Sequence, residues 1–316
     1  MKTKNITSLA AASLALSGAL LLQACSLTSH PVAPSAMGKP SGSAELERLI
    51  DQPGPIDLIT INSADWAVPL AGLINLNSAA AQKAHLIDRE EPIQVFAHVI
   101  RHPQRGVYLV DTGVSRKLLE DPDQEGLNWV IRKGMPIEKM KIQKSTADIL
   151  ENINGKLAGV FFTHLHIDHL SGMPDIPADV ALYVGESESS ERNLINIFVH
   201  GATNRLLRDK QGLQEWRFKP DPQQQFEGVI DIFGDGSVFA LSVPGHTSGS
   251  TAYLVRTRKG PVLLTGDTCH TRWGWDNTVE PGNFTRDNER NLKSLNSLKA
   301  LVARHPGIEV RLGHQR

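Results

Sequence analysis

The segment Thr163-His164-Leu165-His166-Ile167-Asp168-His169 contains four potential metal ligands within six residues. It follows an apolar run, Leu157–Phe162, that predicts a buried strand. His164 and His166 are two residues apart, so they project to the same side of an extended backbone. Asp168 and His169 fall on the following turn and can reach a second ion nearby. Imidazole and carboxylate ligands together suit zinc, iron or manganese, so the stretch predicts a metal site.

Three more metal-capable side chains come later in the chain. Each stands at the end of a predicted strand with a glycine beside it: His246, Asp267 and His314. Glycine lets the backbone turn sharply next to a ligand. One such residue alone is an ordinary surface feature. Three of them, beside a cluster of four, indicate a single site.

The order of predicted elements indicates the fold class. Ile56–Ile61, Ile93–Ile100 and Val107–Val110 are β-prone runs near the start, and the last two flank a hairpin turn. Later strands alternate with amphipathic helices such as Ser145–Asn152 and Asn288–Arg304. This order predicts an α/β domain of two mixed β-sheets with helices outside, a four-layer αββα sandwich.

The chain from Ile56 to the C-terminus resembles the metallo-β-lactamase superfamily. The motifs that carry the resemblance occur in the family's order: Asp111-Thr112-Gly113, the His164–His169 run, Gly245-His246-Thr247, Gly266-Asp267-Thr268 and Gly313-His314. The resemblance implies the metallo-β-lactamase fold and two divalent metal ions, with zinc preferred. It also implies a ligand set: one ion on His164, His166 and His246, the other on Asp168, His169 and His314, and Asp267 as the bridge.

The residue types at positions 267 and 270 help to distinguish among the activities found in that family. True β-lactamases of this fold usually carry Cys or Ser where Asp267 stands, so the aspartate argues against that activity. The implied ligand set is similar to that of N-acyl-homoserine lactone lactonases, many of which have Tyr three residues after the bridging Asp. The Asp-x-x-His spacing here resembles instead the methyl parathion hydrolase group, whose members also hydrolyse lactones and esters.

We therefore expect a dinuclear metal-dependent hydrolase in which a hydroxide shared by two ions attacks a lactone or related ester. Organophosphate triester hydrolysis and a non-catalytic, metal-binding envelope lipoprotein are the alternatives. Asp168 and His270 are the candidate catalytic residues. Asp168 would orient the nucleophile, and His270 would donate a hydrogen bond to the developing oxyanion or the leaving oxygen. Packing beside the metals is the alternative for His270.

Aromatic residues near the predicted ligands indicate an apolar pocket for an acyl chain or an aromatic leaving group. The candidates are Trp66, Trp273, Trp275 and Phe284. Ordinary core packing is the alternative for each of them. Residues 186–222 are mostly polar with a helical pattern, and we interpret them as an insertion over the site, a lid that sets the depth of the pocket.

The N-terminal segment carries a targeting signal. Two lysines precede an apolar run, Leu9–Leu22, which is typical of a secretory signal peptide spanning residues 1–24. Leu22-Gln23-Ala24-Cys25 resembles the bacterial lipoprotein cleavage box, which implies a lipid anchor on Cys25; a plain signal peptide is the alternative. Residues 25–55 predict a flexible tether, and 56–316 the hydrolase domain. The expected location is the cell envelope, at the outer membrane facing the periplasm.

Composition limits the partners. The 316 residues include 33 Lys and Arg against 34 Asp and Glu, a net charge of −1. No basic excess argues for nucleic acid. The expected partners are a small ester or lactone and the membrane, reached through the lipid on Cys25, and a homodimer is left open. If Cys25 carries lipid, Cys269 stands alone, so no intrachain disulfide is expected.

Overall fold

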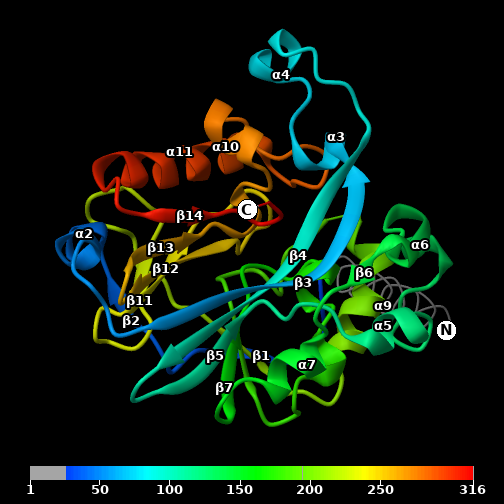
Figure 1. Ribbon diagram of the computed structural model, residues 1–316, viewed down its shortest axis with the longest axis horizontal. Helices are drawn as coiled ribbons and strands as arrows, with labels where there is room; N and C mark the ends of the chain where they lie inside the picture. Colours follow the sequence, from blue (N-terminus) through cyan, green and yellow to red (C-terminus); the bar gives the residue numbers. More distant parts are fainter. Residues whose placement is uncertain (1–25, 194, 316) are drawn as a thin grey trace, which may run out of the picture.

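The computed structural model describes residues 26–193 and 195–315. Within them, two β-sheets pack together between layers of helices (Figure 1). The larger sheet has the strand order β1 (Val32–Pro34), β9 (Leu213–Glu215), β8 (Ala181–Val184), β7 (Leu157–Phe161), β5 (Gly106–Val110), β4 (Glu90–His102), β3 (Asp57–Pro69), β6 (Lys141–Ile142). The smaller sheet has the order β14 (Glu309–Arg311), β13 (Gly260–Leu264), β12 (Thr251–Thr257), β11 (Val238–Ser242), β10 (Val229–Asp231), β2 (Lys39–Ser41).

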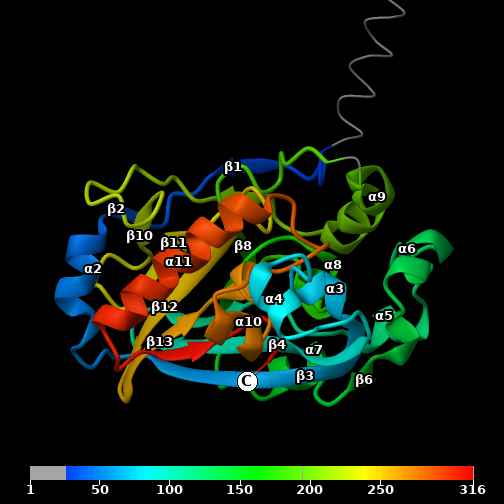
Figure 2. The same ribbon diagram turned by 90° about the horizontal axis from the view of Figure 1, so that it is seen from above.

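The helices lie outside the two sheets or in the connections between strands. They are α2 (Ser43–Ile50), α3 (Leu70–Leu73), α4 (Ala79–Lys83), α5 (Arg116–Glu120), α6 (Trp129–Gly134), α7 (Thr146–Glu151), α8 (Ile167–Leu170), α9 (Asn196–Leu207), α10 (Arg272–Asn277) and α11 (Asn288–Arg304), with short 3₁₀ turns at Ile137–Lys139, Met173–Asp175 and Gly266–Thr268. Figure 2 shows α11 lying across the smaller sheet, and α5 and α7 lie on the far side of the larger one (Figure 1). Helices α3 and α4 lie at the end of the long β3–β4 arm (Figure 1).

Three layers of apolar side chains hold the sandwich together. The inner layer is rich in aromatic residues and joins the sheets: Tyr108 and Phe161 of the larger sheet stack at 4.9 Å between ring centroids, and Tyr253 of the smaller sheet packs on Phe161. One outer layer joins the larger sheet to helices such as α7, and the other joins the smaller sheet to α2 and α11. Both sheets are mixed. The predicted αββα sandwich is therefore confirmed.

Strand direction brings the metal-capable residues to one edge. β5 and β7 are parallel neighbours, so the loops that follow them, at Asp111 and at His164, lie side by side. In the smaller sheet, β11, β13 and β14 all run the same way. Their carboxyl ends therefore carry His246, Asp267 and His314 to the same edge.

The predicted tether is wrong for residues 26–55. β1 pairs with β9, β2 pairs with β10, and α2 packs on the smaller sheet. Leu46 and Ile50 of α2 are fully buried, and each contributes about 1.5–3 kcal/mol by its burial. Leu46 and Ile50 are four residues apart, as on one face of a helix, but the Pro, Ser, Gly and Ala content of the segment is also typical of a linker. Cys25 and the predicted signal peptide lie outside the described residues.

Residues 186–222 are not a separate insertion. They contain one helix, α9, and the strand β9, which pairs with both β8 and β1 in the larger sheet. Trp216 is fully buried in the inner aromatic layer. The start of the segment nevertheless borders the cavity described below, through residues such as Glu191 and Val199. It is thus an integral part of the fold that also walls the site.

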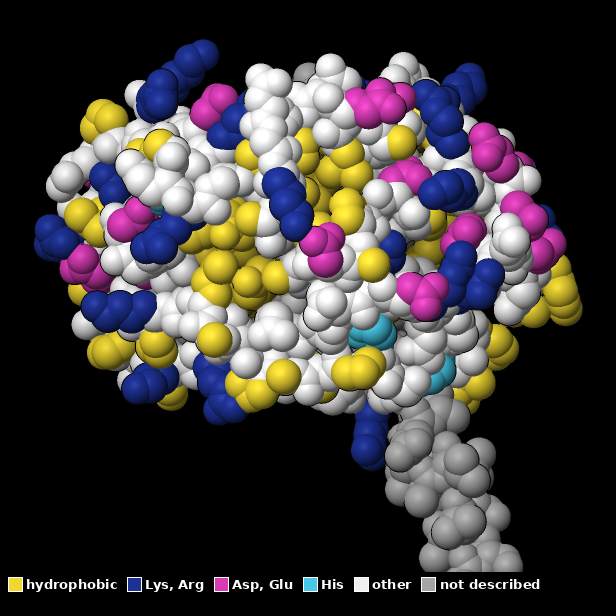
Figure 3. Space-filling view, turned by 90° about the horizontal axis from the view of Figure 1, so that it is seen from below, with side chains coloured by type: hydrophobic (Ala, Val, Ile, Leu, Met, Phe, Trp, Pro, Cys, Tyr) yellow, Lys and Arg dark blue, Asp and Glu magenta, His cyan; other side chains and the backbone are white. Residues whose placement is uncertain are grey.

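The surface carries charges of both signs. Figure 3 shows Lys and Arg side chains interspersed with Asp and Glu over one face of the molecule. This distribution agrees with the net charge of −1 and differs from the single-sign field typical of nucleic-acid binding. Among the helices in the described part of the chain, none has the length and apolar character needed to cross a membrane.

Candidate metal centre

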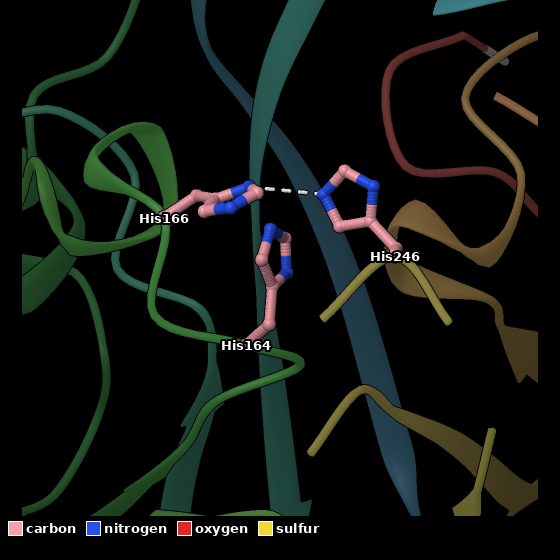
Figure 4. Close-up of side chains that lie close together, drawn as sticks. All are labelled: His164, His166 and His246. Atoms are coloured by element: carbon pink, nitrogen blue, oxygen red, sulfur yellow. Dashed lines mark hydrogen bonds between the residues drawn. The ribbon is translucent and has the colours of Figure 1, made fainter. Parts of the chain in front are cut away.

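Three imidazoles from two different sheets meet at the edge of the sandwich. His164 and His166 lie on the loop after β7, and His246 lies on the loop after β11 (Figure 4). His246 Nε2 is 2.9 Å from His166 Nδ1, and one ring nitrogen from each of the three lies within 4.8 Å of the others. His164 and His246 are buried, whereas His166 is partly exposed.

A second group of metal-capable side chains adjoins the first. It consists of Asp168, His169, Asp267 and His314, whose potential ligand atoms also lie within 4.8 Å of one another. Asp267 Oδ2 is the common point of both groups. It lies close to the Nε2 atoms of five histidines: His270 at 2.9 Å, His314 at 3.2 Å, His169 at 3.4 Å, His246 at 3.5 Å and His164 at 3.7 Å. One carboxylate oxygen therefore faces both groups.

Buried atoms without partners test whether these residues fit metal ions. Among the buried side-chain atoms that make no hydrogen bond in the described part of the chain are His164 Nε2, His169 Nε2 and Asp267 Oδ1. Leaving a buried polar atom unsatisfied costs about 1–3 kcal/mol, and more for a charged group. All three atoms belong to the two groups, and imidazole nitrogen and carboxylate oxygen are ligands for divalent cations. The residues thus fit two metal ions.

Three of the histidine rings are held in place through Nδ1, the nitrogen that points away from Asp267. Nδ1 of His169 donates to Asp111 Oδ2 at 2.8 Å, and Nδ1 of His314 donates to the Gln94 carbonyl at 2.8 Å. Nδ1 of His246 lies 3.1 Å from Thr285 Oγ1. Such contacts fix the ring orientation and the tautomer of metal-binding histidines. They leave Nε2 of each ring facing the shared Asp267 carboxylate.

Asp111 is a supporting residue that the sequence marked only as part of a turn. Besides His169, its carboxylate accepts hydrogen bonds from the Thr163 N–H and the Thr163 hydroxyl, each at 2.8 Å. Asp111 has a φ of 54°, a left-handed conformation that Asp tolerates better than most residues. The Asp-Thr-Gly motif marked Asp111 in the sequence, but the contact of Asp111 with His169 depends on the pairing of β5 with β7.

Burial and neighbouring charges set the protonation of the histidines. Burial, together with the nearby imidazoles, holds the pKa of His164 and of His246 well below the ordinary value. Burial also lowers the pKa of His314, but the carboxylates of Asp267 and Asp168 outweigh it and raise that pKa to about 10. His164 and His246 are therefore neutral at pH 7, which is the form of imidazole that binds a metal ion.

A cavity of about 430 Å³ opens over the two groups, with a lining more apolar than polar. Asp168, His270 and His314 border it. The structure places two of the four predicted aromatic residues in the lining of this cavity. Trp66 and Phe284 line the cavity. Trp66 lies on the part of β3 that continues beyond a bulge near Asn62.

Trp273 and Trp275 do not belong to the lining. Trp273 packs against the helical side of the larger sheet, and Trp275 is buried in the layer between the smaller sheet and α11. Lys299 Nζ lies 5.6 Å from the centroid of the Trp275 ring. Both tryptophans are on α10, whose short length gives the sequence no periodicity from which its buried face can be predicted.

A model of the metallo-β-lactamase superfamily matches residues 91–314. The chain belongs to this superfamily. It is 30% identical over 233 residues to the N-acyl homoserine lactonase AttM of Rhizobium johnstonii, an alignment that covers 72% of this chain and 83% of the relative.

Solved structures show the same fold. A quorum-quenching N-acyl homoserine lactone lactonase superposes with a TM-score of 0.58 at 18% identity, covering 84% of this chain and 94% of the other. AidC, a dizinc quorum-quenching lactonase, superposes with a TM-score of 0.53 at 12% identity, covering 84% of this chain and 89% of the other. The domain described above thus corresponds to nearly the full length of these lactonases.

Proposed function

We propose that this chain is a dinuclear metal-dependent hydrolase that opens N-acyl homoserine lactones or closely related lactones and esters. The observation that carries the proposal is Asp267 Oδ2, which faces both groups of imidazoles at the floor of a mostly apolar cavity. The similarity of the chain to the N-acyl homoserine lactonase AttM supports lactones as the substrate class. All seven candidate ligand positions carry residues that can bind a metal ion, which argues against a non-catalytic role for the protein.

Each side chain has a place in the proposed mechanism. His164, His166 and His246 would hold one ion, Asp168, His169 and His314 the other, and Asp267 would bridge them. When bound, such ions polarise a carbonyl oxygen and make water nucleophilic at neutral pH. Sets of three or four nitrogen and carboxylate donors are typical of zinc sites, so we infer zinc.

The cavity residues act on the substrate. Asp168 borders the cavity, where its carboxylate can accept a hydrogen bond from the attacking water and orient it. His270 also borders the cavity, and its Nε2 is aimed at Asp267. A hydrogen bond from Nε2, made in exchange for its contact with Asp267, would stabilise negative charge on the oxygen of the opening lactone. Trp66, Leu73 and Phe284 provide apolar surface for an acyl chain.

A panel of four substrates tests the proposal. It consists of an acyl-homoserine lactone, a simple γ-lactone, an aryl ester and a methyl phosphotriester, assayed with the same zinc-loaded protein. The acyl-homoserine lactone is expected to give the highest kcat/KM, since it alone has both an acyl chain for the apolar wall and a lactone. A higher kcat/KM on the phosphotriester would instead support the phosphotriesterase alternative. Activity on none of the four would contradict both.

We also propose that the chain is a lipoprotein of the bacterial envelope, anchored through Cys25 and facing the periplasm. The sequence Leu22-Gln23-Ala24-Cys25 supports the proposal. Ser26, the first described residue, is only partly buried, and its carbonyl accepts a hydrogen bond from His200 of α9 at 2.8 Å. Ser26 therefore contacts α9 while remaining partly accessible to solvent.

Substitution of Cys25 by serine is expected to abolish lipid attachment, because serine offers no thiol. Incorporation of labelled palmitate into the full-length protein, produced in a bacterial host, measures this. Cys269→Ser is the matched control, since Cys269 is buried and its loss leaves Cys25 intact. Persistent labelling of Cys25→Ser would show that the lipoprotein proposal is wrong.

A further inference from the structure

Glu188 is a fully buried carboxylate that has no part in the chemistry proposed above. It lies on the turn that follows β8. Its Oε1 accepts a hydrogen bond from the Leu165 N–H at 2.7 Å. Its Oε2 accepts hydrogen bonds from the Thr247 hydroxyl at 2.7 Å and from the Gly249 N–H at 3.0 Å. All three donors lie on loops that carry candidate metal ligands.

The two loops that Glu188 joins come from different sheets. Leu165 stands between His164 and His166, on the loop after β7 of the larger sheet. Thr247 directly follows His246, on the loop after β11 of the smaller sheet. The three imidazoles of the first group can share an ion only if these loops keep a fixed separation. Glu188 bridges them through one carboxylate group.

The backbone is shaped for this contact. A Cβ added to Gly249 would lie 2.6 Å from Glu188 Cβ, which is closer than side-chain atoms approach. The absence of a side chain at Gly249 therefore lets its N–H reach the carboxylate. A buried carboxylate costs several kcal/mol unless donors compensate for the water it loses. Here all the compensating donors belong to the two ligand loops, so the loops and the carboxylate stabilise one another.

We propose that Glu188 is a positioning residue that fixes the spacing of His164, His166 and His246 and thereby sets the affinity of that group for its metal ion. The inference rests on the proposed metal-dependent function. It adds a determinant of metal affinity that contacts neither the ion nor the substrate. Outer residues that orient metal ligands typically change metal affinity about 10- to 100-fold when they are replaced.

Glu188→Gln tests the proposal because the amide has the size of the carboxylate but only one acceptor oxygen. Its NH₂ group would face either the Leu165 N–H or the Gly249 N–H, and both of these are donors. Titration of the full-length apoprotein with zinc, in competition with a fluorescent chelator, is expected to show one of the two ions bound about 10- to 100-fold more weakly. With excess zinc, kcat is expected to return to within a few-fold of wild type.

Glu125→Gln is the matched control. Glu125 is also a buried carboxylate, but its partner is Arg208, with its oxygens 3.2 and 3.4 Å from the guanidinium, and it does not line the cavity. This variant is expected to keep both zinc affinities. If Glu188→Gln is too unstable to purify, Thr247→Val removes one donor of the same bridge, and Thr247→Ser keeps it. The valine variant alone is then expected to bind one zinc ion more weakly.

Unchanged zinc affinities in Glu188→Gln, with or without a loss of thermal stability, would overturn the proposal. So would weakened binding of equal size in Glu125→Gln. The readout is metal affinity, so it is independent of the substrate. If the wild-type protein binds zinc but hydrolyses no lactone or ester, the proposed function fails while the role of Glu188 can still be measured.

Discussion

Replacement of Asp267 by alanine is expected to lower kcat/KM for the lactone at least about 1,000-fold while the protein still folds. Asp267 is a carboxylate that faces both groups of imidazoles, with five Nε2 atoms between 2.9 and 3.7 Å from its Oδ2. Its loss would remove the proposed bridge between two metal ions, together with its negative charge. Paired ions contribute several kcal/mol to transition-state stabilisation, and each 1.36 kcal/mol corresponds to a tenfold change in rate.

Steady-state kinetics with added zinc, together with circular dichroism to confirm folding, measure this effect. Asp276→Ala is the control, since Asp276 is an exposed residue of α10 that does not line the cavity; it is expected to leave kcat/KM unchanged. Wild-type activity in Asp267→Ala would show that the bridging role is wrong.

His270→Ala is expected to lower kcat about 100- to 1,000-fold with little change in KM, the effect of removing one well-placed hydrogen-bond donor to a developing oxyanion. The ring lies at the border of the cavity. Nδ1 lies 3.3 Å from the Leu73 carbonyl and Nε2 lies 2.9 Å from Asp267 Oδ2, so donation to the substrate requires Nε2 to exchange its contact with Asp267 for one with the substrate oxygen.

His270→Gln retains a hydrogen-bond donor near the same position and is expected to recover part of the lost kcat. Zinc content is measured in both variants, because His270 also lies within ligand distance of His246 and Asp267. A wild-type kcat in His270→Ala would assign the ring to packing alone. A fall in kcat that parallels a loss of zinc would assign it to holding the metal.

The strand-end residues were predictable because their signal is local. His164 to His169 follow an apolar strand directly, and His246, Asp267 and His314 follow others, so residue type and strand position sufficed. Asp111 also directly follows a strand, but neither its position nor that of Glu188 indicates which residues it contacts. Each is a single carboxylate whose partners lie far along the chain, and its role exists only once β5 meets β7 or the two sheets meet.

The errors have related causes. Leu46 and Ile50 sit at helical spacing in residues 26–55, but the surrounding Pro, Ser, Gly and Ala content is also that of a linker. The three-residue strands β1 and β2 are too short to show a periodicity. Trp273 and Trp275 stand near the bridging Asp267 in sequence, yet α10 turns both away from the cavity. Proximity along the chain did not determine on which side of the helix they packed.

The metal content of the purified full-length protein tests the central claim most directly. Elemental analysis after growth with supplemented zinc, and after removal of loosely bound metal by gel filtration, gives the number of ions per chain. The two adjoining groups of ligands around Asp267 predict about two divalent ions per chain, principally zinc, and loss of hydrolysis when a chelator removes them. Fewer than one ion per chain, or hydrolysis that persists in the metal-free protein, would contradict the account.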